Sequence, residues 1–261
     1  SKRSTSAAFR MHSRLTGQNG LSTYSTAAES DYSTYLQTDE QAGFELTGFW
    51  GTSPAVYYSW KRAPSFFDVV AGTGTSTLDA VSHNLGVTPE LIIQKKRSGS
   101  SSMDWFVTGS GVGGTNKYLI LNSTAAVATT VTLAHDASTF TPIFDQDNYI
   151  AYLFASLDGV SKVGSYTGDG STDGSKVIDC GFSSGARFVL IKRTDNVGSW
   201  YVWDTERGIV VGNDPILQLN STAAEVTASD DLVPSSSGFA VRNSGASVNI
   251  NSATYIFYAI A

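Results

Sequence analysis

A tetrapeptide that recurs at a fixed long interval constrains the fold of this chain more than any other feature. Ser-Thr-Ala-Ala occupies residues 25–28 and returns at residues 123–126 and 221–224, so that each interval is 98 residues. Self-similarity at a fixed period is the sequence signature of repeated structural units. We therefore predict tandem copies of one domain of about 98 residues.

The surroundings of the tetrapeptides define how much of each copy is present. Residues 90–95 align with residues 187–192, and further matches on both sides extend this alignment. We therefore expect residues 65–157 and residues 158–261 to form two complete copies, and residues 1–64 to hold only the back half of a third. A half copy cannot close its own hydrophobic core. We expect it to pack on its neighbours or on partner chains, or to take strands from a missing upstream segment.

Composition and turn spacing indicate the fold class. Charged residues make up 15% of the chain, against about 25% in ordinary soluble proteins, whereas Gly, Tyr, Phe and Trp are plentiful. Aromatic and β-branched residues favour strands, and glycine supplies turns. Each complete copy divides into about six or seven short strands, the number typical of an antiparallel β-sandwich. The predicted fold is all-β: tandem antiparallel β-sandwich domains, two complete and one partial.

Each copy ends in an alternating aromatic strand, at residues 56–60, 150–154 and 256–260. Alternate residues of a strand share one face. One face therefore carries the following residues, which we predict to lie in the core: Val56, Tyr58, Trp60, Ile150, Tyr152, Phe154, Ile256, Tyr258 and Ile260. Trp105 of one copy matches Trp200 of the next, and Val107 matches Val202. We expect these four residues in the core as well.

The charge balance argues against nucleic acid as a partner. The net charge is −6 and the pI is near 5.0, whereas a phosphate-binding face needs a basic field. Lysine and arginine do cluster at residues 2–3, 61–62, 95–97 and 192–193. We interpret these clusters as solvated strand ends.

No arrangement of residues in the sequence points to catalysis, a metal or a cofactor. His12, His83 and His135 do not recur at the repeat period, and no Gly-x-Ser-x-Gly elbow is present. We interpret His83 as a turn histidine that donates hydrogen bonds to backbone, and Cys180 as a small buried side chain. Residues 169–174 offer oxygen ligands for calcium but lack the spacing of an EF-hand. Carboxylate pairs such as those at residues 145 and 147 lie in polar turns.

Surface aromatic residues are the best candidates for a binding role. Tyr201 and Trp203 lie opposite the predicted core face by strand alternation, and Phe49 with Trp50 forms a second, weaker candidate. An exposed tryptophan is typical of an interface or a receptor contact. We predict that these four residues contact a partner chain or a receptor.

Several runs resemble a known family. Residues 58–70 and 81–93, followed by Asp-Trp-Phe-Val at 104–107 and Tyr-Leu-Ile-Leu-Asn at 118–122, are similar to an uncharacterised repeat domain of tail fibre and other structural proteins of tailed phages, many of them marine. The second copy departs from this pattern at residues 180–185. The resemblance implies a virion component that is trimeric or otherwise symmetric and contacts other virion proteins.

Three functions remain open on the sequence alone. The leading hypothesis is a bacteriophage tail fibre or appendage protein, without enzymatic activity, that binds a host-surface glycan or protein. The second is a capsid decoration or head-fibre protein, and the third is a polysaccharide-degrading enzyme of the tailspike kind. No apolar run approaches the ~18–20 residues that a membrane span needs, so we expect no membrane insertion. The chain begins in mid-pattern, and we interpret it as a piece of a longer protein.

Overall fold

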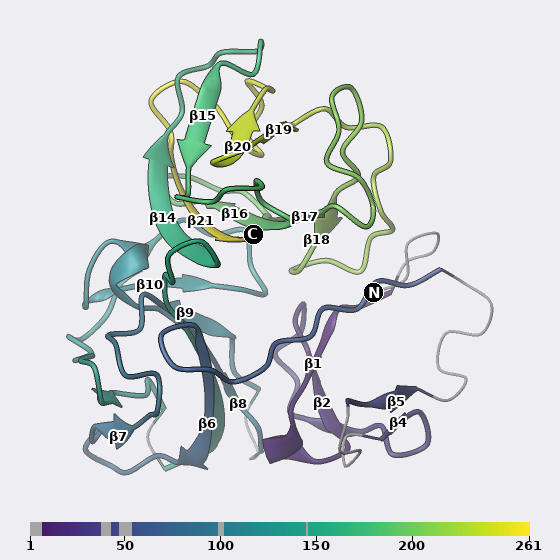
Figure 1. The fold of residues 1–261 in the computed structure, drawn as a ribbon. Helices are drawn as coiled ribbons and strands as arrows, with labels where there is room; N and C mark the ends of the chain where they lie inside the picture. The colour runs from purple at the N-terminus through teal and green to yellow at the C-terminus, as the bar shows by residue number, and fades with distance from the viewer. Residues whose placement is uncertain (1–6, 38–42, 47–53, 99–101, 145) are drawn as a thin grey trace.

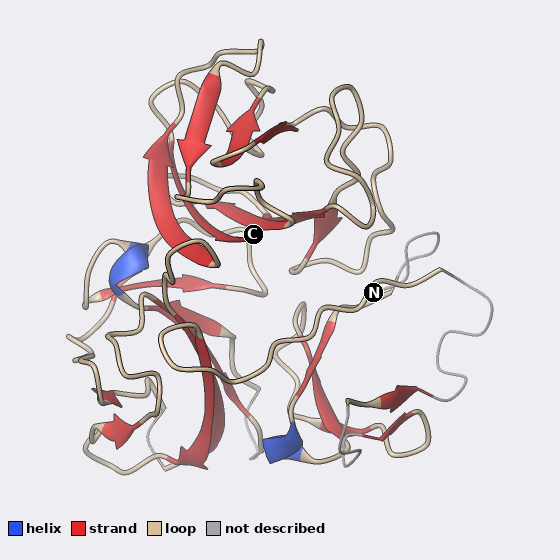
Figure 2. Cartoon of the chain, in the orientation of Figure 1, coloured by secondary structure: helices blue, strands red, loops and turns tan. Residues whose placement is uncertain are grey.

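In the computed structural model the chain folds into three lobes of antiparallel β-structure (Figure 1). The structure describes residues 7–37, 43–46, 54–98, 102–144 and 146–261. Within these ranges there is no α-helix; two single-turn 3-10 helices, η1 (Arg14–Thr16) and η2 (Ser110–Val112), lie among the strands (Figure 2). The all-β prediction is confirmed.

The N-terminal lobe is the smallest. A three-stranded sheet has the order β1-β2-β3, and β4 pairs with β5. The strands are β1 (Arg10–His12), β2 (Asn19–Ser22), β3 (Ser30–Asp31), β4 (Leu36–Gln37) and β5 (Glu45–Leu46). A connecting segment, residues 54–66, then runs between the lobes to β6 (Figure 1).

The middle lobe, residues 65–157, pairs a large sheet with a small one. The large sheet has the order β11-β10-β9-β8-β13-β6, and the small sheet pairs β12 with β7. The strands are β6 (Phe67–Thr73), β7 (Val81–Ser82), β8 (Leu91–Lys96), β9 (Phe106–Thr108), β10 (Lys117–Ile120), β11 (Ala128–Thr129), β12 (Thr139–Phe140) and β13 (Asn148–Phe154).

The C-terminal lobe, residues 158–261, is arranged in the same way. The large sheet has the order β14-β21-β16-β17-β18, and the small sheet the order β15-β20-β19. The strands are β14 (Ser161–Thr167), β15 (Lys176–Asp179), β16 (Phe188–Arg193), β17 (Trp200–Asp204), β18 (Leu217–Gln218), β19 (Leu232–Ser235), β20 (Gly238–Val241) and β21 (Thr254–Ile260).

The two large sheets match in register as well as in strand order. Lys95 of β8 pairs with Ile150 of β13, and Lys192 of β16 pairs with Ile256 of β21. The alignment of residues 90–95 with 187–192 therefore places equivalent residues at equivalent points of the two sheets.

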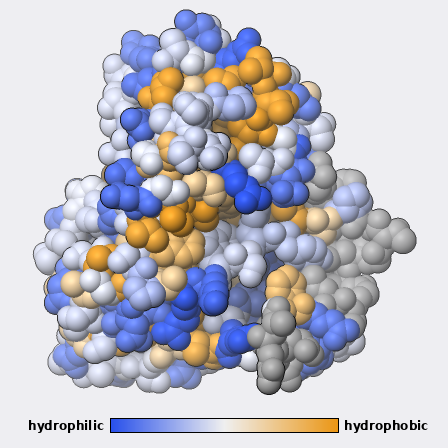
Figure 3. Space-filling view, viewed as in Figure 1, coloured by the Kyte–Doolittle hydropathy of each residue, from blue (hydrophilic) through white to orange (hydrophobic). Residues whose placement is uncertain are grey.

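One hydrophobic cluster joins the three lobes. It contains Leu21 of the N-terminal lobe, the Tyr152 face of the middle sheet and the Tyr258 face of the C-terminal sheet. Hydrophobic side chains also gather where the C-terminal lobe meets the middle lobe on the face drawn in Figure 3.

The predicted burial is confirmed for the second and third stripes, of which Ile260 alone is only partly buried. The first stripe was predicted wrongly as a strand: residues 56–60 form no strand, Tyr58 and Trp60 are partly buried against this cluster, and Val56 is not part of it. The stripes, however, lie between lobes and do not fill the interior of each sandwich.

The opposite faces of the large sheets form two further cores. Trp203 and Phe257 pack beneath the small sheet of the C-terminal lobe, and Tyr149 and Phe140 lie in the corresponding core of the middle lobe. Each large sheet is thus covered on both faces, by a small sheet on one side and by neighbouring lobes on the other. The prediction of a single buried face was wrong for this reason.

The N-terminal and middle lobes meet at the first Ser-Thr-Ala-Ala segment. The indole N–H of Trp105 donates to the Ser22 carbonyl at 3.0 Å. Lys95 Nζ donates to the Thr26 carbonyl at 2.8 Å, and the Met103 N–H donates to the same oxygen at 3.1 Å. Backbone carbonyls of one lobe therefore receive the polar ends of buried side chains from the next.

The middle and C-terminal lobes meet in the same way. The indole N–H of Trp200 donates to the Ile120 carbonyl at 2.9 Å, and Lys192 Nζ donates to the Thr124 carbonyl at 3.2 Å. The Gly198 N–H also donates to the Thr124 oxygen, at 2.9 Å. Ile120 and Thr124 each lie 98 residues after the corresponding acceptor of the first junction.

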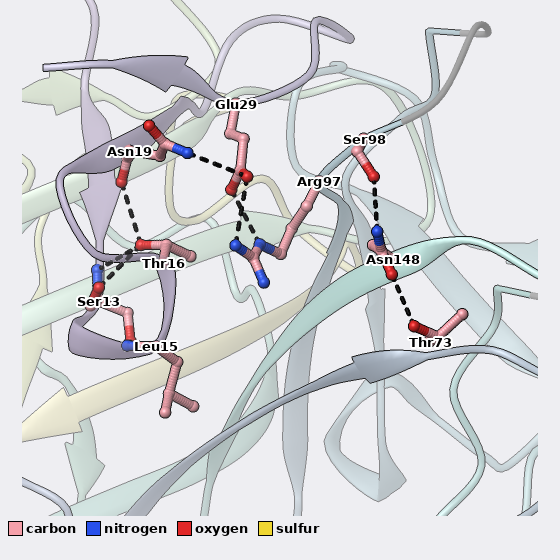
Figure 4. A network of polar contacts seen from close by, with 9 residues as sticks. All are labelled: Ser13, Leu15, Thr16, Asn19, Glu29, Thr73, Arg97, Ser98 and Asn148. Carbon is pink, nitrogen blue, oxygen red and sulfur yellow. Dashed lines mark hydrogen bonds and ion pairs between the residues drawn. The ribbon is translucent and has the colours of Figure 1, made fainter.

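Among the described residues, an ion pair strengthens the first junction and not the second. Arg97 Nε lies 2.9 Å from Glu29 Oε2, and the other carboxylate oxygen, Oε1, accepts a hydrogen bond from the Asn19 side chain at 3.2 Å (Figure 4). In the second junction the residue 98 positions after Glu29 is Val127. The backbone bond is nevertheless kept in both, because the N–H of Glu29 and that of Val127 each donate across the junction.

Candidate functional site: an aromatic hollow between lobes

A surface hollow of about 280 Å³ lies between the connecting segment and the C-terminal lobe. One wall is the extended stretch of residues 56–60, and the other comes from the ends of β16, β17 and β21. We call it the aromatic hollow, because the residues that line it include Tyr57, Tyr58, Trp60, Phe66 and Phe188.

Edge-to-face ring contacts hold the two walls together. The ring centroids of Tyr58 and Phe188 are 5.1 Å apart, and those of Trp60 and Phe188 are 5.7 Å apart. Trp60 also contacts Phe154 of the middle lobe at 6.4 Å. Such pairs contribute about 0.5–1.5 kcal/mol each beyond area burial. The base of the hollow is therefore a packed aromatic joint of three segments.

A buried ionic group lies behind these rings. The Tyr58 hydroxyl donates to Asp204 Oδ2 at 2.6 Å, and Arg207 Nε lies 2.5 Å from the same oxygen. Arg207 also pairs with Glu225 at 3.3 Å. All three charged side chains are at most 5% exposed. Burial raises the pKa of the Tyr58 hydroxyl well above its ordinary value, so this group acts as a hydrogen-bond donor.

The rim of the hollow offers exposed groups of two kinds. The Tyr57 side chain is 46% exposed and lies beside Phe44, with ring centroids 6.2 Å apart. Arg187 and Glu206 form an exposed ion pair at 3.8 Å. Aromatic faces pack against the apolar faces of sugar rings, and charged groups hydrogen-bond to hydroxyls. This arrangement suits a polyhydroxylated ligand.

The predicted contact residues have a different outcome. Trp203 is fully buried between the two sheets of the C-terminal lobe, so its prediction as a surface contact was wrong. Tyr201 is half-buried and packs against the same core. The physical cause is the small sheet, which covers the face that strand alternation alone leaves open. Phe49 and Trp50 lie outside the described residues.

Two of the basic clusters are not solvated. Lys95 is 1% exposed and Lys192 is fully buried, and both carry hydrogen bonds across lobe junctions. Burial lowers the pKa of both ammonium groups to about 8. The sequence indicated this role, because Lys95 and Lys192 stand at matched positions, each one residue before the end of an apolar strand. By contrast, Lys61 and Arg62 are exposed.

The remaining sequence candidates have structural roles. His83 contacts the Asp136 carbonyl at 3.1 Å through Nε2, and its Nδ1 accepts the Leu85 N–H, as expected of a turn histidine. Cys180 is buried, and burial raises its thiol pKa to about 12. Asp169 in the suspected calcium loop accepts hydrogen bonds from Ser171 and Asn249.

The described residues hold no group of three or more His, Cys, Asp or Glu side chains placed to bind a metal ion. In the same part of the chain no helix has the length and apolar character needed to cross a membrane.

Comparison with known proteins places the chain in a family. Its residues 59–261 match the family model described as a domain of unknown function, DUF7483. This match spans the middle and C-terminal lobes together, in agreement with the core that they share. No curated protein and no solved structure matches the chain. The chain therefore belongs to the DUF7483 family of domains of unknown function.

Proposed function

We propose that this chain is a structural protein of a bacteriophage virion, part of a tail fibre or related appendage, and that it binds host-surface carbohydrate at the aromatic hollow. The assignment to a virion rests on the resemblance of residues 58–122 to phage structural repeats. The carbohydrate ligand rests on one observation, the exposed Tyr57 ring beside the Arg187–Glu206 ion pair.

The surroundings of the hollow support recognition at a fixed geometry. Its base is held by rings from three segments and by the Tyr58–Asp204–Arg207 group. A binding surface whose side chains are already fixed loses little conformational entropy when a ligand arrives. A rigid, shallow, partly polar surface suits repeated weak contacts, which multivalent particles combine into firm attachment.

The carboxylates that line the hollow support a role without catalysis. Asp204 is paired with Arg207 and its side chain is only 5% exposed, so Glu206 is the one accessible carboxylate among the described residues that line the hollow. A glycosidase needs two carboxylates that flank the substrate bond from an accessible cleft. We therefore propose a binding and structural role in preference to polysaccharide cleavage.

A glycan array with the purified chain tests the carbohydrate ligand. We expect retention of a subset of host-surface oligosaccharides, with affinity at least tenfold weaker for Tyr57→Ala, about 1.4 kcal/mol. Tyr24→Ala is the matched control, because Tyr24 is 42% exposed on the N-terminal lobe, away from the hollow. Equal loss in both variants, or no retained glycan, contradicts carbohydrate binding at this site.

Labelling of virus particles tests the proposed place in the virion. Gold-labelled antibody against the chain is expected on the tail or its fibres. Label on the head instead supports a decoration or head-fibre protein.

Prolonged incubation with host polysaccharide tests the enzymatic alternative, because released oligosaccharides contradict a role limited to binding. The resemblance to phage structural repeats also implies a symmetric oligomer, with a trimer favoured, and the mass of the purified chain in solution tests this.

A further inference from the structure

A second hollow, of about 220 Å³, opens on the C-terminal lobe beside the aromatic hollow. We call it the serine hollow, because it is lined by residues 184–186, by residues 234–236, and by Thr205 and Ile209. Thr205 lines both hollows. The two hollows are therefore direct neighbours on one surface of the protein.

Backbone hydrogen bonds fix the ridge between the two hollows. The Thr205 N–H donates to the Arg187 carbonyl at 2.9 Å, and the Arg187 N–H donates to the Ile260 carbonyl at 2.7 Å. The side chain of Arg187 lines the aromatic hollow, whereas the preceding residue, Ala186, lines the serine hollow. A chain-like ligand that crosses this ridge from the aromatic hollow therefore enters the serine hollow.

The walls of the serine hollow are also fixed by the backbone. The Gly185 N–H donates to the Ser236 carbonyl at 2.8 Å. Gly185 has a φ of +80°, and a Cβ at this position would lie 2.5 Å from the Ser235 carbonyl oxygen. Only glycine permits this conformation together with so close an approach. The shape of the hollow is therefore formed before any ligand arrives, which lowers the entropic cost of binding.

Four side-chain hydroxyls line the serine hollow, those of Ser184, Thr205, Ser235 and Ser236. None of them makes a hydrogen bond to another residue in the part of the chain that the structure describes. Each hydroxyl can donate one hydrogen bond and accept others. The hollow thus offers several unengaged donors and acceptors to a ligand.

The fold of a lobe does not require the Ser236 hydroxyl. His83 of the middle lobe and Cys180 of the C-terminal lobe are equivalent, because each donates its N–H to the carbonyl of a serine two residues before a core phenylalanine. On this match the middle lobe has Ala137 in place of Ser236. The hydroxyl is therefore available for a role other than folding.

We propose that the serine hollow is a second subsite for carbohydrate. The ligand is an oligosaccharide with one unit against Tyr57 and a neighbouring, uncharged hexose unit in the serine hollow. This inference rests on the proposed carbohydrate binding at the aromatic hollow.

The lining of the serine hollow selects an uncharged unit. Its hydroxyls hydrogen-bond the hydroxyls of a hexose, and Ile209 and Pro234 cover apolar C–H groups of the ring. Among the described residues that line this hollow no side chain is charged. A carboxylated or sulfated sugar would therefore lose hydration here without gaining an ion pair.

Linear neutral oligosaccharides of increasing length test this proposal. The probes are the glucose, mannose and galactose series, from monosaccharide to hexasaccharide, titrated calorimetrically against the full chain. We expect one series to bind, with an affinity at least tenfold higher for the hexasaccharide than for the monosaccharide. Ser236→Trp fills the serine hollow, so in this variant the hexasaccharide should bind no better than the monosaccharide.

Ser183→Trp is the matched control for added bulk. Ser183 is exposed next to Ser184 but does not line the hollow, so this variant should keep the dependence on length. Ser236→Ala removes the hydroxyl without adding bulk. It should weaken hexasaccharide binding by about two- to tenfold, the effect of one lost hydrogen bond.

The outcomes separate this proposal from the proposed function. If Tyr57→Ala weakens binding but affinity does not rise with length, or if Ser236→Trp keeps the full dependence on length, the second subsite is overturned and the aromatic hollow remains a carbohydrate site. Retention of acidic glycans alone on the array, with no neutral series bound, also overturns the second subsite. Retention of no glycan at all contradicts the proposed function as well.

Discussion

Trp200 of the C-terminal lobe donates its indole N–H to the carbonyl oxygen of Ile120 in the middle lobe, at 2.9 Å. Trp105 makes the same bond one junction earlier, to Ser22 at 3.0 Å. Both tryptophans lie in the core that the lobes share. The indole therefore supplies apolar area and a directed polar contact at the same point, which fixes the relative position of two lobes.

Replacing a junction tryptophan by phenylalanine is expected to cost more than the lost ring area. Trp200→Phe removes the donor to Ile120 in a buried site, and a lost buried hydrogen bond costs about 1–3 kcal/mol. Trp203→Phe is the matched control, because the buried Trp203 indole N–H has no hydrogen-bond partner among the residues that the structure describes. Urea unfolding should show Trp200→Phe less stable than Trp203→Phe by about 1 kcal/mol or more. Equal stability of the two variants would contradict a role for the bond.

The two buried lysines predict a rise in stability with pH. Burial lowers the pKa of Lys95 and Lys192 from 10.5 to about 8, so the unfolded chain binds more protons than the folded one between these values. Stability therefore increases as pH rises through this window, by about 1 kcal/mol per lysine from pH 8 to pH 9. Unfolding free energies at these two pH values measure it.

The double variant Lys95→Met and Lys192→Met isolates this effect. Methionine keeps an unbranched apolar chain but cannot titrate. Cys180, whose pKa burial raises to about 12, opposes the trend above about pH 9, but it does so equally in both proteins. The unfolding free energy of the wild type minus that of the variant should therefore rise from pH 8 to pH 9. A constant difference across this range counts against buried, partly neutral lysines.

Removing one hydroxyl should loosen the connecting segment. Tyr58→Phe keeps the ring contact with Phe188 but loses the 2.6 Å hydrogen bond to Asp204, a charge-assisted bond worth about 1.5–3 kcal/mol. We expect faster amide exchange and easier proteolysis around residues 54–66. Tyr57→Phe serves as the control, since the Tyr57 hydroxyl makes no hydrogen bond to a described residue. Similar exchange in the two variants would show that the bond does not hold the segment.

His12 in β1 predicts that mild acid weakens the N-terminal lobe. Burial, with a smaller effect from the Arg10 charge, lowers its pKa from 6.5 to about 4. Between these values the unfolded chain binds more protons, so stability falls as pH falls from about 6.5 to 4. Amide exchange of β1 and β2 against pH measures this, with His12→Phe as the reference that lacks the titrating ring. An identical pH dependence in both proteins contradicts the prediction.

Much of the local structure follows from the sequence alone. The 98-residue spacing of Ser-Thr-Ala-Ala and the matched segments 90–95 and 187–192 correspond to equivalent strands. Alternation correctly grouped Ile150, Tyr152 and Phe154 on one buried face. These properties are set by the period of the strand, which is two residues whatever lies around it.

What covers each face was decided only by the tertiary structure. Trp203 is buried because a small sheet closes over it, and Lys192 because a carbonyl of another lobe receives it. Tyr58 meets Asp204, the residue 146 positions further along the chain, at the aromatic hollow. A repeating pattern assigns residues to faces, but the packing partner of a face depends on distant contacts that leave no local period in the sequence.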